Sequence, residues 1–262
     1  MKLEKVSYHT HTTISDGKLS PEELIKLAIE KGFKVLAITD HYTRTGGISS
    51  SGWGMDFYSD DDYENLVRLK EKYSDKIKIL VGAEFDWLPT KKEWLSEEVK
   101  KRDYDIKILS FHQIYINGKY YNFNASEDRF ENVLNLFDNS MHKLVRYYYE
   151  NLRDGIKTGW FDVVGHLDLV KIFNKDSKYF SEDENWYKKE VLDTLELMKK
   201  FNMKLDVNLQ GFIFAIGEQF PSKWIISEAK KMGIELLVGT DSHSPDTLDY
   251  DLGKVEELMD GK

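Results

Sequence analysis

The sequence contains no cysteine, and this absence excludes two kinds of chemistry. A chain without thiols has neither a disulfide framework nor a thiolate zinc site, so any metal ion must be held by histidine, aspartate or glutamate. Long apolar runs are also missing, since no stretch approaches the ~20 residues that span a bilayer. Residues 1–5 lack the apolar core of a signal peptide. We therefore expect a soluble protein with a cytoplasmic location.

Positive charge is in short supply. The chain has 37 lysine and arginine residues against 46 aspartate and glutamate residues, which gives a net charge of −9. Proteins that bind nucleic acids broadly neutralise many phosphates with lysine and arginine, so this balance argues against a nucleic-acid partner. A small phosphorylated substrate would need local positive charge, and bound metal ions are a source of it.

Internal repeats, low-complexity tracts and linkers rich in proline or glycine are absent as well, so no boundary is evident inside the chain. A length of 262 residues, with 41% hydrophobic and 32% charged residues, fits a single α/β barrel domain. We therefore predict one domain over residues 1–262. The oligomeric state stays open.

Helix signals recur along the chain. Ser20 and Glu23 form a capping box at the start of one helix, with proline at its first position. Further helices are predicted near residues 62–73, over about residues 125–157, and after a cap at Ser181, three residues before a glutamate.

Apolar runs typical of buried strands alternate with these helices. Seven strands are predicted, at residues 5–9, 35–38, 77–81, 106–109, 163–164, 205–208 and 236–238. Strands that alternate with helices form parallel sheets, and this number fits a distorted, TIM-like (β/α)7 barrel.

Nine potential metal ligands lie where these strands run out into loops. They are His9, His11, Asp16, His41, Glu84, His112, His166, Asp241 and His243. A barrel of parallel strands brings the carboxyl ends of all its strands to one face, so ligands spread over the whole chain can converge there. His142, the remaining histidine, lies inside a predicted helix and is excluded. The spacing therefore predicts one polynuclear metal site.

The ligand types indicate the metals and the chemistry. Imidazole nitrogen with carboxylate oxygen admits zinc, manganese or iron and disfavours pure magnesium or calcium sites. Nine ligands exceed what one ion uses, so two or three divalent ions are expected. Such a cluster can polarise a phosphoryl oxygen, lower the pKa of a bound water toward about 7, and stabilise the attacking and leaving oxygens together. These are the requirements of phosphoester hydrolysis.

Six short motifs carry these ligands: Tyr8-His9-Thr10-His11-Thr12 with Ser15-Asp16-Gly17, Ile38-Thr39-Asp40-His41, Gly82-Ala83-Glu84, Ser110-Phe111-His112, Gly165-His166 and Asp241-Ser242-His243. In this order they resemble the motifs of the polymerase and histidinol phosphatase (PHP) superfamily of metal-dependent phosphoesterases. Residues 163–171 further resemble a segment of histidinol-phosphate phosphatases. The resemblance implies a PHP-type barrel with its metal site at the carboxyl ends of the strands, and hydrolysis of L-histidinol phosphate in histidine biosynthesis.

The resemblance also implies roles for single residues. Three groups would each hold one ion: His9, His11, Glu84 and Asp241; Glu84, His112 and His166; Asp16, His41 and His243. Glu84 would bridge two ions, and a hydroxide held between ions would attack phosphorus in line. Asp168 and His243 are candidates for assisting the leaving alkoxide, although Asp168 could instead orient a ligand imidazole. Lys171 and Arg44 are the candidates for substrate binding.

The substrate loops depart from the histidinol-phosphatase pattern. Gly211 is followed by Phe212 where a basic residue is common, and Lys171 stands where arginine is expected. Another small phosphomonoester therefore stays open as the substrate. A nuclease-like phosphodiesterase and a metal-binding domain without catalysis are further alternatives. Residues 42–59, which include Trp53 and are rich in glycine and serine, are interpreted either as a lid over the site or as an ordinary surface loop.

Overall fold

The computed structural model describes residues 4–43, 58–250 and 252–254. Arg44, Trp53 and most of the segment interpreted as a lid lie outside these described residues.

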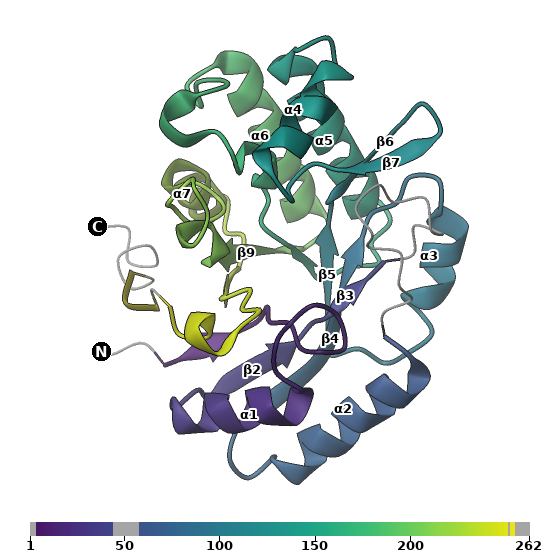
Figure 1. The fold of residues 1–262 in the computed structure, drawn as a ribbon, viewed down its shortest axis with the longest axis vertical. Coiled ribbons are helices and arrows are strands. Elements are labelled where there is room, and N and C mark those ends of the chain that lie inside the picture. Colours follow the sequence, from purple (N-terminus) through teal and green to yellow (C-terminus); the bar gives the residue numbers. More distant parts are fainter. Residues whose placement is uncertain (1–3, 44–57, 251, 255–262) are drawn as a thin grey trace.

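A parallel sheet, nearly closed into a barrel, forms the centre of the structure (Figure 1). Its strands follow the order β1 (Val6–Ser7), β2 (Val35–Ile38), β4 (Lys78–Asp86), β5 (Ile106–Ser110), β8 (Val163–Val164), β9 (Lys204–Asn208) and β10 (Leu236–Gly239), and β3 (His41–Tyr42) pairs beside β4. The first and last strands also meet, because the Tyr8 N–H donates to the Val238 carbonyl oxygen at 2.8 Å. The seven predicted strands and the barrel are thus confirmed.

Seven helices of the described residues flank the sheet: α1 (Pro21–Glu30), α2 (Asp60–Lys72), α3 (Lys92–Glu98), α4 (Glu127–Asn135), α5 (Met141–Ile156), α6 (Asn185–Lys200) and α7 (Lys223–Lys231). Figure 1 shows α1 and α2 along one side of the barrel and α4, α5 and α6 on the opposite side. The capping box predicted for α1 is present, since the Ser20 side chain accepts from the Glu23 N–H and the Glu23 carboxylate accepts from the Ser20 N–H. None of the described helices is long and apolar enough to cross a membrane.

The prediction of one continuous helix over residues 125–157 is wrong. The chain forms α4 and α5 instead, and Asp138 and Asn139 between them have positive φ angles of 56° and 57°. Aspartate and asparagine adopt this left-handed conformation more readily than most residues, and it interrupts a right-handed helix. The Ser140 side chain then accepts from the Lys143 N–H and begins α5.

The predicted cap at Ser181 is also wrong. Helix α6 begins at Asn185 with Glu184 as its N-cap residue and no side-chain capping hydrogen bond. The Ser181 hydroxyl oxygen instead accepts from the Asp183 N–H in a local turn.

A two-stranded hairpin after β5 was not predicted. Its strands β6 (Gln113–Ile116) and β7 (Lys119–Asn122) pair antiparallel, with Gln113 opposite Asn122. The turn at Asn117 and Gly118 has φ angles of 52° and 80°. Asn-Gly with both φ angles positive is the sequence signature of a tight hairpin turn, so the signal was available.

Close packing of α5 anchors the strand that carries part of the site. Leu109 on β5 and Leu152 and Ile156 on α5 are fully buried in one cluster, and each such burial contributes about 1.5–3 kcal/mol. The helix can approach because Gly155 has no side chain: a Cβ atom there would lie 2.8 Å from Leu109 Cδ1. The end of β5, which lies two residues before His112, is therefore held in place.

Candidate metal centre

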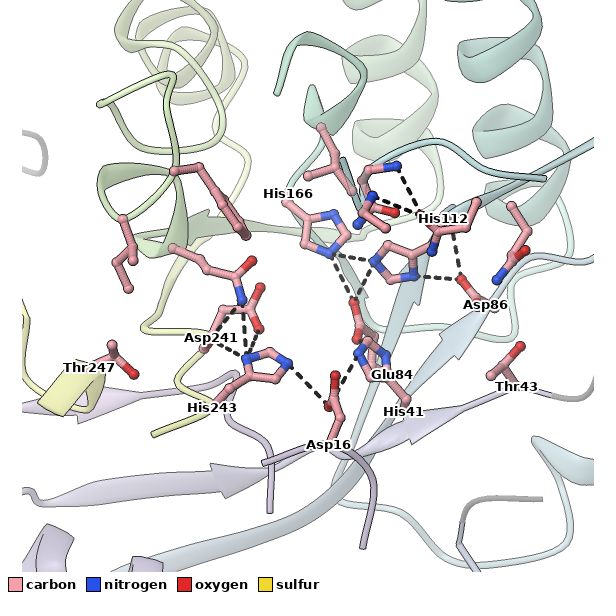
Figure 2. A pocket seen from close by; sticks show the side chains of 18 of the residues that line it. Asp16, His41, Thr43, Glu84, Asp86, His112, His166, Asp241, His243 and Thr247 are labelled. Atoms are coloured by element: carbon pink, nitrogen blue, oxygen red, sulfur yellow. Dashed lines mark hydrogen bonds and ion pairs between the residues drawn. The ribbon is translucent and has the colours of Figure 1, made fainter. Parts of the chain in front are cut away.

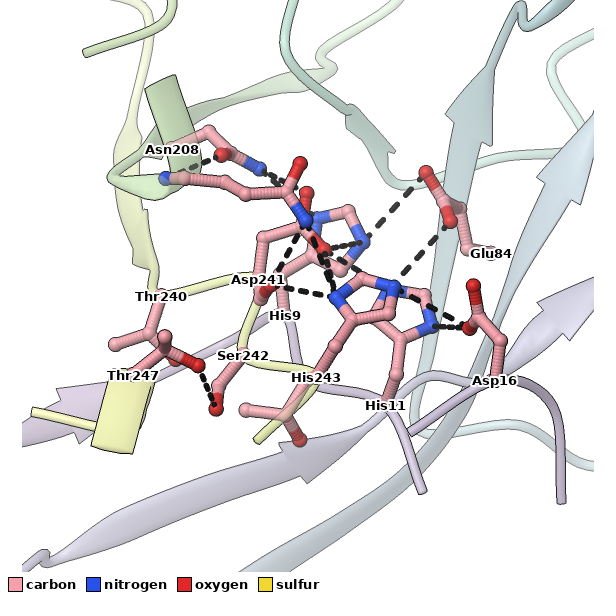
Figure 3. A network of polar contacts seen from close by, with 12 residues as sticks. His9, His11, Asp16, Glu84, Asn208, Thr240, Asp241, Ser242, His243 and Thr247 are labelled. Carbon is pink, nitrogen blue, oxygen red and sulfur yellow. Dashed lines mark hydrogen bonds and ion pairs between the residues drawn. The ribbon is translucent and has the colours of Figure 1, made fainter. Parts of the chain in front are cut away.

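The nine predicted metal ligands meet in one cluster at the carboxyl ends of the strands (Figures 2 and 3). They come from the following positions: His9 and His11 after β1, Asp16 on the next loop, His41 in β3, Glu84 in β4, His112 after β5, His166 after β8, and Asp241 and His243 after β10. Six of the seven histidines of the chain are in this cluster, as the strand-end rule predicts.

Glu84 lies at the centre of the cluster and is 1% exposed. Its Oε1 atom is 2.9 Å from His166 Nε2, 3.5 Å from His9 Nε2 and 3.6 Å from His112 Nε2. Its Oε2 atom is 2.7 Å from His41 Nδ1. The two carboxylate oxygens thus face different imidazoles, which is the arrangement that a bridging ligand requires.

Asp241 and Asp16 organise the other side of the cluster (Figure 3). Asp241 Oδ1 lies 3.0 Å from His11 Nε2 and 3.7 Å from His9 Nε2. Asp16 Oδ1 lies 3.2 Å from His243 Nε2. Three groups have ligand atoms within 4.8 Å of one another: His11, Asp16, His41 and His243; His9, His11 and Asp241; His41, Glu84 and His112.

Unpaired atoms at the centre of the cluster show that these residues fit metal ions. His9 Nε2, His11 Nε2 and Asp241 Oδ1 are buried, and they approach one another or Glu84 without making a hydrogen bond of normal geometry within the described residues. A buried polar atom without a partner costs about 1–3 kcal/mol. These nitrogen and oxygen atoms converge, and coordination of a divalent ion would satisfy them together. The donor set therefore suits divalent metal ions, and the choice among zinc, manganese and iron stays a prediction.

Charges within the cluster shift its pKa values strongly. Burial disfavours the charged form of His41, but the Glu84 carboxylate outweighs burial and raises the pKa of His41 to about 9. Burial also disfavours the charged form of His243, but the Asp16 carboxylate outweighs burial and raises the pKa of His243 to about 9. Burial, with the imidazoles of His243 and His41, lowers the pKa of His11 to about 3. Protons and metal ions would compete for these nitrogens, because a coordinating imidazole nitrogen must be free of its proton.

Asp16 lies in the segment Ser15-Asp16-Gly17, which is also a turn sequence, and buried Asp40 fixes the loop that contains it. Asp40 Oδ1 accepts from the Thr12 N–H at 2.7 Å and from the Ser15 hydroxyl at 2.6 Å. Gly17 is needed at the turn, since a Cβ atom there would lie 2.5 Å from the His11 carbonyl oxygen. Turn and ligand are therefore compatible roles for this segment.

Asp206 orients one ligand from within β9, and it was not predicted. The His9 Nδ1–H donates to Asp206 Oδ2 at 2.9 Å, which leaves His9 Nε2 directed at the cluster. Asn208 Nδ2 donates to Asp206 Oδ2 at 2.9 Å and to Asp241 Oδ2 at 3.0 Å. Gly239 permits this approach, because a Cβ atom there would lie 2.2 Å from Asp206 Oδ1. The sequence did contain a signal for this role, because Asp206 is a charged residue inside a predicted buried strand.

Asp86 supports a second ligand in the same way. The His112 Nδ1–H donates to Asp86 Oδ1 at 2.7 Å, so His112 Nε2 points at Glu84. Gln210 lies 3.1 Å from His243 Nδ1 through its Nε2 atom and donates to the Asp241 carbonyl oxygen. Such outer partners fix the tautomer and orientation of ligand imidazoles.

Lys171, the predicted substrate-binding residue, and Asp168, the candidate for proton transfer, lie outside the metal cluster in a second group of charged residues. Lys171 is fully buried, and its Nζ atom is 2.6 Å from Glu218 Oε1 and 3.2 Å from both Glu182 Oε1 and Asp168 Oδ2. The Asp168 carboxylate accepts from the Ser222 N–H at 2.9 Å, and burial raises the pKa of Asp168 to about 6 despite Lys171. The protons of the Lys171 ammonium group are directed at oxygens of the chain itself.

A cavity of about 460 Å³ opens over the metal cluster (Figure 2). Lys18 is the only lysine or arginine among its described lining residues, and its backbone N–H donates to the His243 carbonyl oxygen at 2.9 Å. The remaining lining residues include four amides, Gln113, Asn122, Asn124 and Gln210, and four apolar side chains, Ala125, Leu169, Ile213 and Phe214. Lys18 was not predicted, although it directly follows Ser15-Asp16-Gly17 and so belongs to the same ligand loop.

A nearly closed parallel barrel with a histidine and carboxylate cluster at its strand ends defines the class of PHP-type metal-binding barrels. The family model described as PHP domain matches residues 7–210, and the chain belongs to this family.

Relatives with similar length cover most of the chain. A histidinol-phosphatase of Lactococcus lactis is 26% identical over 254 residues, which are 92% of this chain and 85% of that protein. The crystal structure of hisK from Listeria monocytogenes superposes with a TM-score of 0.80 at 23% identity and covers 96% of this chain and 99% of that one. The structure of the Lactococcus lactis histidinol phosphate phosphatase, complexed with zinc, L-histidinol and phosphate, gives a TM-score of 0.72 at 21% identity, with coverage of 99% and 94%. These likenesses establish the fold.

Proposed function

We propose that this protein is a metal-dependent phosphomonoesterase that hydrolyses L-histidinol phosphate to L-histidinol and phosphate. The observation that carries the proposal is the cluster itself: it contains three ligand groups, the ligand atoms of each group lie within 4.8 Å of one another, and several of these residues line one cavity. The histidinol-phosphatase of Lactococcus lactis, which shares most of the length of the chain, supports the choice of substrate.

Two or three divalent ions of zinc, manganese or iron would be held by the three ligand groups. Bound there, they would activate water and neutralise charge on the phosphoryl oxygens. Glu84 is the residue placed to bridge two ions, because its two oxygens face different imidazoles. Asp206 and Asp86 would hold the His9 and His112 rings in the orientation needed to bind the ions through Nε2.

Lys18 is the proposed phosphate contact of the chain. Its side chain lines the cavity, and no ion pair or hydrogen bond to its Nζ atom occurs within the described residues. Lys171, by contrast, is enclosed by carboxylates of the chain. Lys18 is exposed at the mouth of the site, and an ammonium group there would stabilise the negative charge on the phosphoryl oxygens of the transition state.

His243 is better assigned to metal binding than to proton transfer. Of the two candidate proton donors, Asp168 lies outside the cavity and His243 lines it. His243 Nε2 is 3.2 Å from Asp16 Oδ1, at a ligand position. A ring that coordinates through this nitrogen has no proton there to donate, so we propose that water entering the cavity protonates the leaving alkoxide.

A second candidate is hydrolysis of another small phosphomonoester. The observation that favours it is the apolar rim: Ile213 is 46% and Phe214 38% exposed beside the cavity, and they directly follow Phe212, which stands where the histidinol-phosphatase pattern has a basic residue. A phosphodiesterase acting on oligonucleotides receives less support, because the described cavity wall has one lysine and no arginine to follow a phosphate backbone.

A substrate panel tests the proposal. The purified protein is stripped of metal, reconstituted separately with zinc, manganese and iron(II), and assayed for phosphate release. We expect L-histidinol phosphate to be hydrolysed with a higher kcat/KM than p-nitrophenyl phosphate, and bis-p-nitrophenyl phosphate to be left nearly intact. Hydrolysis of the generic monoester without histidinol phosphate would overturn the substrate and retain the chemistry. Preference for the diester would overturn both.

A further inference from the structure

Two neighbouring strands carry metal ligands on one face and aromatic side chains on the other. His41 on β3 pairs in register with Glu84 on β4, and the next residues, Tyr42 and Phe85, pair in the same way. Because side chains alternate along a strand, the first pair faces the metal cluster and the second faces away from it. Tyr42 and Phe85 are 6% and 0% exposed, and their ring centroids are 5.0 Å apart. The aromatic pair therefore packs behind two central ligands.

Arg102, between α3 and β5, supports this aromatic layer. Its side chain is 5% exposed, and its guanidinium carbon lies 5.7 Å from the centroid of the Tyr42 ring. Five hydrogen bonds match its five N–H groups: Nε and Nη2 donate to Asp60 Oδ1 at 3.1 and 2.6 Å, Nη2 donates to the Tyr58 carbonyl oxygen at 3.4 Å, and Nη1 donates to the hydroxyl oxygens of Tyr42 and Tyr104 at 3.2 and 2.9 Å. A guanidinium group with all its donors engaged is a rigid support.

Strand β3 depends on this support because little else holds it. It has two residues and, within the described part of the chain, pairs only with β4. The position of His41 therefore depends on how its neighbour Tyr42 is held. The Tyr42 hydroxyl group accepts from Arg102 Nη1 and donates to Glu98 Oε2, so it is fixed from two sides. Loss of Arg102 would remove one of these partners and the group that covers the Tyr42 ring.

The orientation of His41 matters to more than one part of the cluster. His41 belongs to two of the three ligand groups. Its Nδ1 atom lies 2.7 Å from Glu84 Oε2, and its Nε2 atom lies 3.7 Å from Asp16 Oδ1. Because the two ring nitrogens face different carboxylates, a shift of this ring would change the geometry of both groups.

We infer that Arg102 is a positioning residue of the metal centre, which holds Tyr42 in place and thereby directs His41 at Glu84 and Asp16. The inference rests on the proposed metal-dependent phosphatase function, and it concerns how the ligands are held rather than which ester is cleaved. Arg102 does not line the cavity, and none of its hydrogen bonds goes to a metal ligand. Its effect on metal binding must therefore pass through its neighbours.

The test measures metal affinity directly. Arg102→Met removes the N–H donors and keeps an unbranched side chain, and the metal-free protein is titrated with zinc in competition with a chromophoric chelator. We expect the zinc affinity of at least one site to fall about 10- to 100-fold, as for other residues that orient ligand imidazoles. The visible spectrum of the cobalt(II)-loaded protein should also change, because it depends on coordination geometry. With p-nitrophenyl phosphate at saturating zinc, kcat should fall while KM stays within about threefold.

Arg153→Met is the matched control. The Arg153 side chain is 15% exposed, and it joins α5 to α6 by donating to Glu190 Oε2 at 2.7 Å and to Thr194 Oγ1 at 3.1 Å. Its loss should destabilise the fold but leave zinc affinity within about threefold and the cobalt spectrum unchanged. Arg102→Lys keeps the charge with only three donors, so it should weaken zinc binding about 3- to 10-fold. It serves as the second variant if Arg102→Met does not fold.

Tyr42→Phe tests the route from Arg102 to the metal. This variant removes the hydroxyl group and keeps the ring, and we expect it to weaken zinc binding about 3- to 10-fold. In the double variant Arg102→Met/Tyr42→Phe, zinc should bind no more than about threefold more weakly than in Arg102→Met alone, because both changes break the same contact. Unchanged zinc affinity in Tyr42→Phe, or fully additive losses in the double variant, would overturn the route through Tyr42.

The metal titrations separate this inference from the proposed function. Zinc affinity and a cobalt spectrum like those of the wild type in Arg102→Met would overturn the positioning role. Equal weakening of zinc binding in Arg153→Met would overturn it as well, because the effect would then follow from general destabilisation. A wild-type protein that binds zinc but hydrolyses no phosphomonoester would overturn only the proposed function, since weaker zinc binding in Arg102→Met would still support the role of Arg102.

Discussion

Two buried charged clusters lie in this barrel, and they differ in where their positive charge comes from. The metal cluster gathers carboxylates and imidazoles around Glu84 and leaves several of their atoms unpaired. The second cluster gathers the carboxylates of Asp168, Glu182 and Glu218 around the ammonium group of Lys171. In the second cluster the chain itself supplies the cation, which is Lys171. In the metal cluster the chain supplies only ligands for a cation.

The comparison shows that buried charge does not by itself identify a catalytic site. Both clusters follow strand ends, and both shift pKa values, since the pKa of Asp168 is raised to about 6 by burial. The distinguishing features are unpaired atoms that converge and a cavity that reaches them. In the second cluster the Lys171 Nζ atom contacts oxygens of Glu182, Glu218 and Ser222, and Asp168 Oδ1 is its one unpaired atom within the described residues. A second cavity is lined by Glu182, Glu218 and Ser222, but Lys171 itself is not among its lining residues. Its cluster is expected to stabilise the fold.

The largest effect is expected from Glu84→Gln. The substitution keeps the shape of the side chain and removes the central negative charge, so bound metal and phosphatase activity should be lost together, with activity down about a thousandfold or more. Metal content by elemental analysis and phosphate release measure the two. Glu182→Gln, the same change in the Lys171 cluster, should leave metal content intact. Full metal content and activity in Glu84→Gln would disprove its bridging role.

Lys171→Met should destabilise the fold instead. Removal of the cation leaves three carboxylates facing one another, and breaking a buried ion pair typically costs about 3–5 kcal/mol. Urea denaturation of the metal-free protein measures the loss. Metal content per folded molecule should stay unchanged, and exposed Lys223→Met should cost less than about 0.5 kcal/mol. A stable Lys171→Met protein with a selectively raised KM would instead place Lys171 in substrate binding.

The stability of the metal-free protein should fall as pH rises from about 6.5 to 9. The folded-state pKa values of His41 and His243 are raised from 6.5 to about 9, so their contribution is complete below pH 6.5 and is lost as pH rises through 9. Each shift corresponds to roughly 3 kcal/mol. Added metal should stabilise the protein more at pH 9 than at pH 6.5, because protons no longer compete.

Thermal unfolding in chelator and in zinc, at both pH values, measures this difference. The Lys171 cluster provides the internal contrast, since the pKa of Lys171 is raised above its ordinary value and so lies outside the window. His243→Asn should reduce the pH slope of the metal-free protein. A slope that is unchanged in this variant would show that His243 does not hold a proton in the cluster.

The smallest effect is expected from Lys18→Met. If the Lys18 ammonium group contacts phosphate, its loss should lower kcat/KM about tenfold for every phosphomonoester, which corresponds to about 1.4 kcal/mol. Lys18→Arg should recover most of this loss. A decrease confined to histidinol phosphate would contradict a phosphate contact and assign Lys18 to the alcohol part.

The metal ligands were predictable because their positions follow from one rule. Histidines and carboxylates at the ends of parallel strands must share a face, and this holds for Glu84 in β4 as for His166 after β8. Asp206 was missed because its role depends on the neighbouring strand β10, where Gly239, the register partner of Asn208, leaves room for the Asp206 carboxylate. Pairing between distant segments is not visible in a single strand pattern.

Lys171 shows more clearly what could not be predicted from the sequence. In the sequence it is a lysine after a strand end and resembles an exposed phosphate contact. Its partners Glu182 and Glu218 come from positions 11 and 47 residues further along the chain, and only the folded structure brings them around it. The break at Asp138 and the hairpin turn at Asn117 had local signals, so those two errors were avoidable.

The hairpin of β6 and β7 has a bearing on how such enzymes diversify. Within the described residues these strands pair only with each other, whereas the metal ligands belong to strands of the barrel and to the loops directly after them. Substitutions in the hairpin therefore leave the register of the barrel untouched. After gene duplication, changes in this short segment could alter which ester the enzyme binds while all metal ligands stay the same. Related enzymes with the same barrel could therefore act on different substrates.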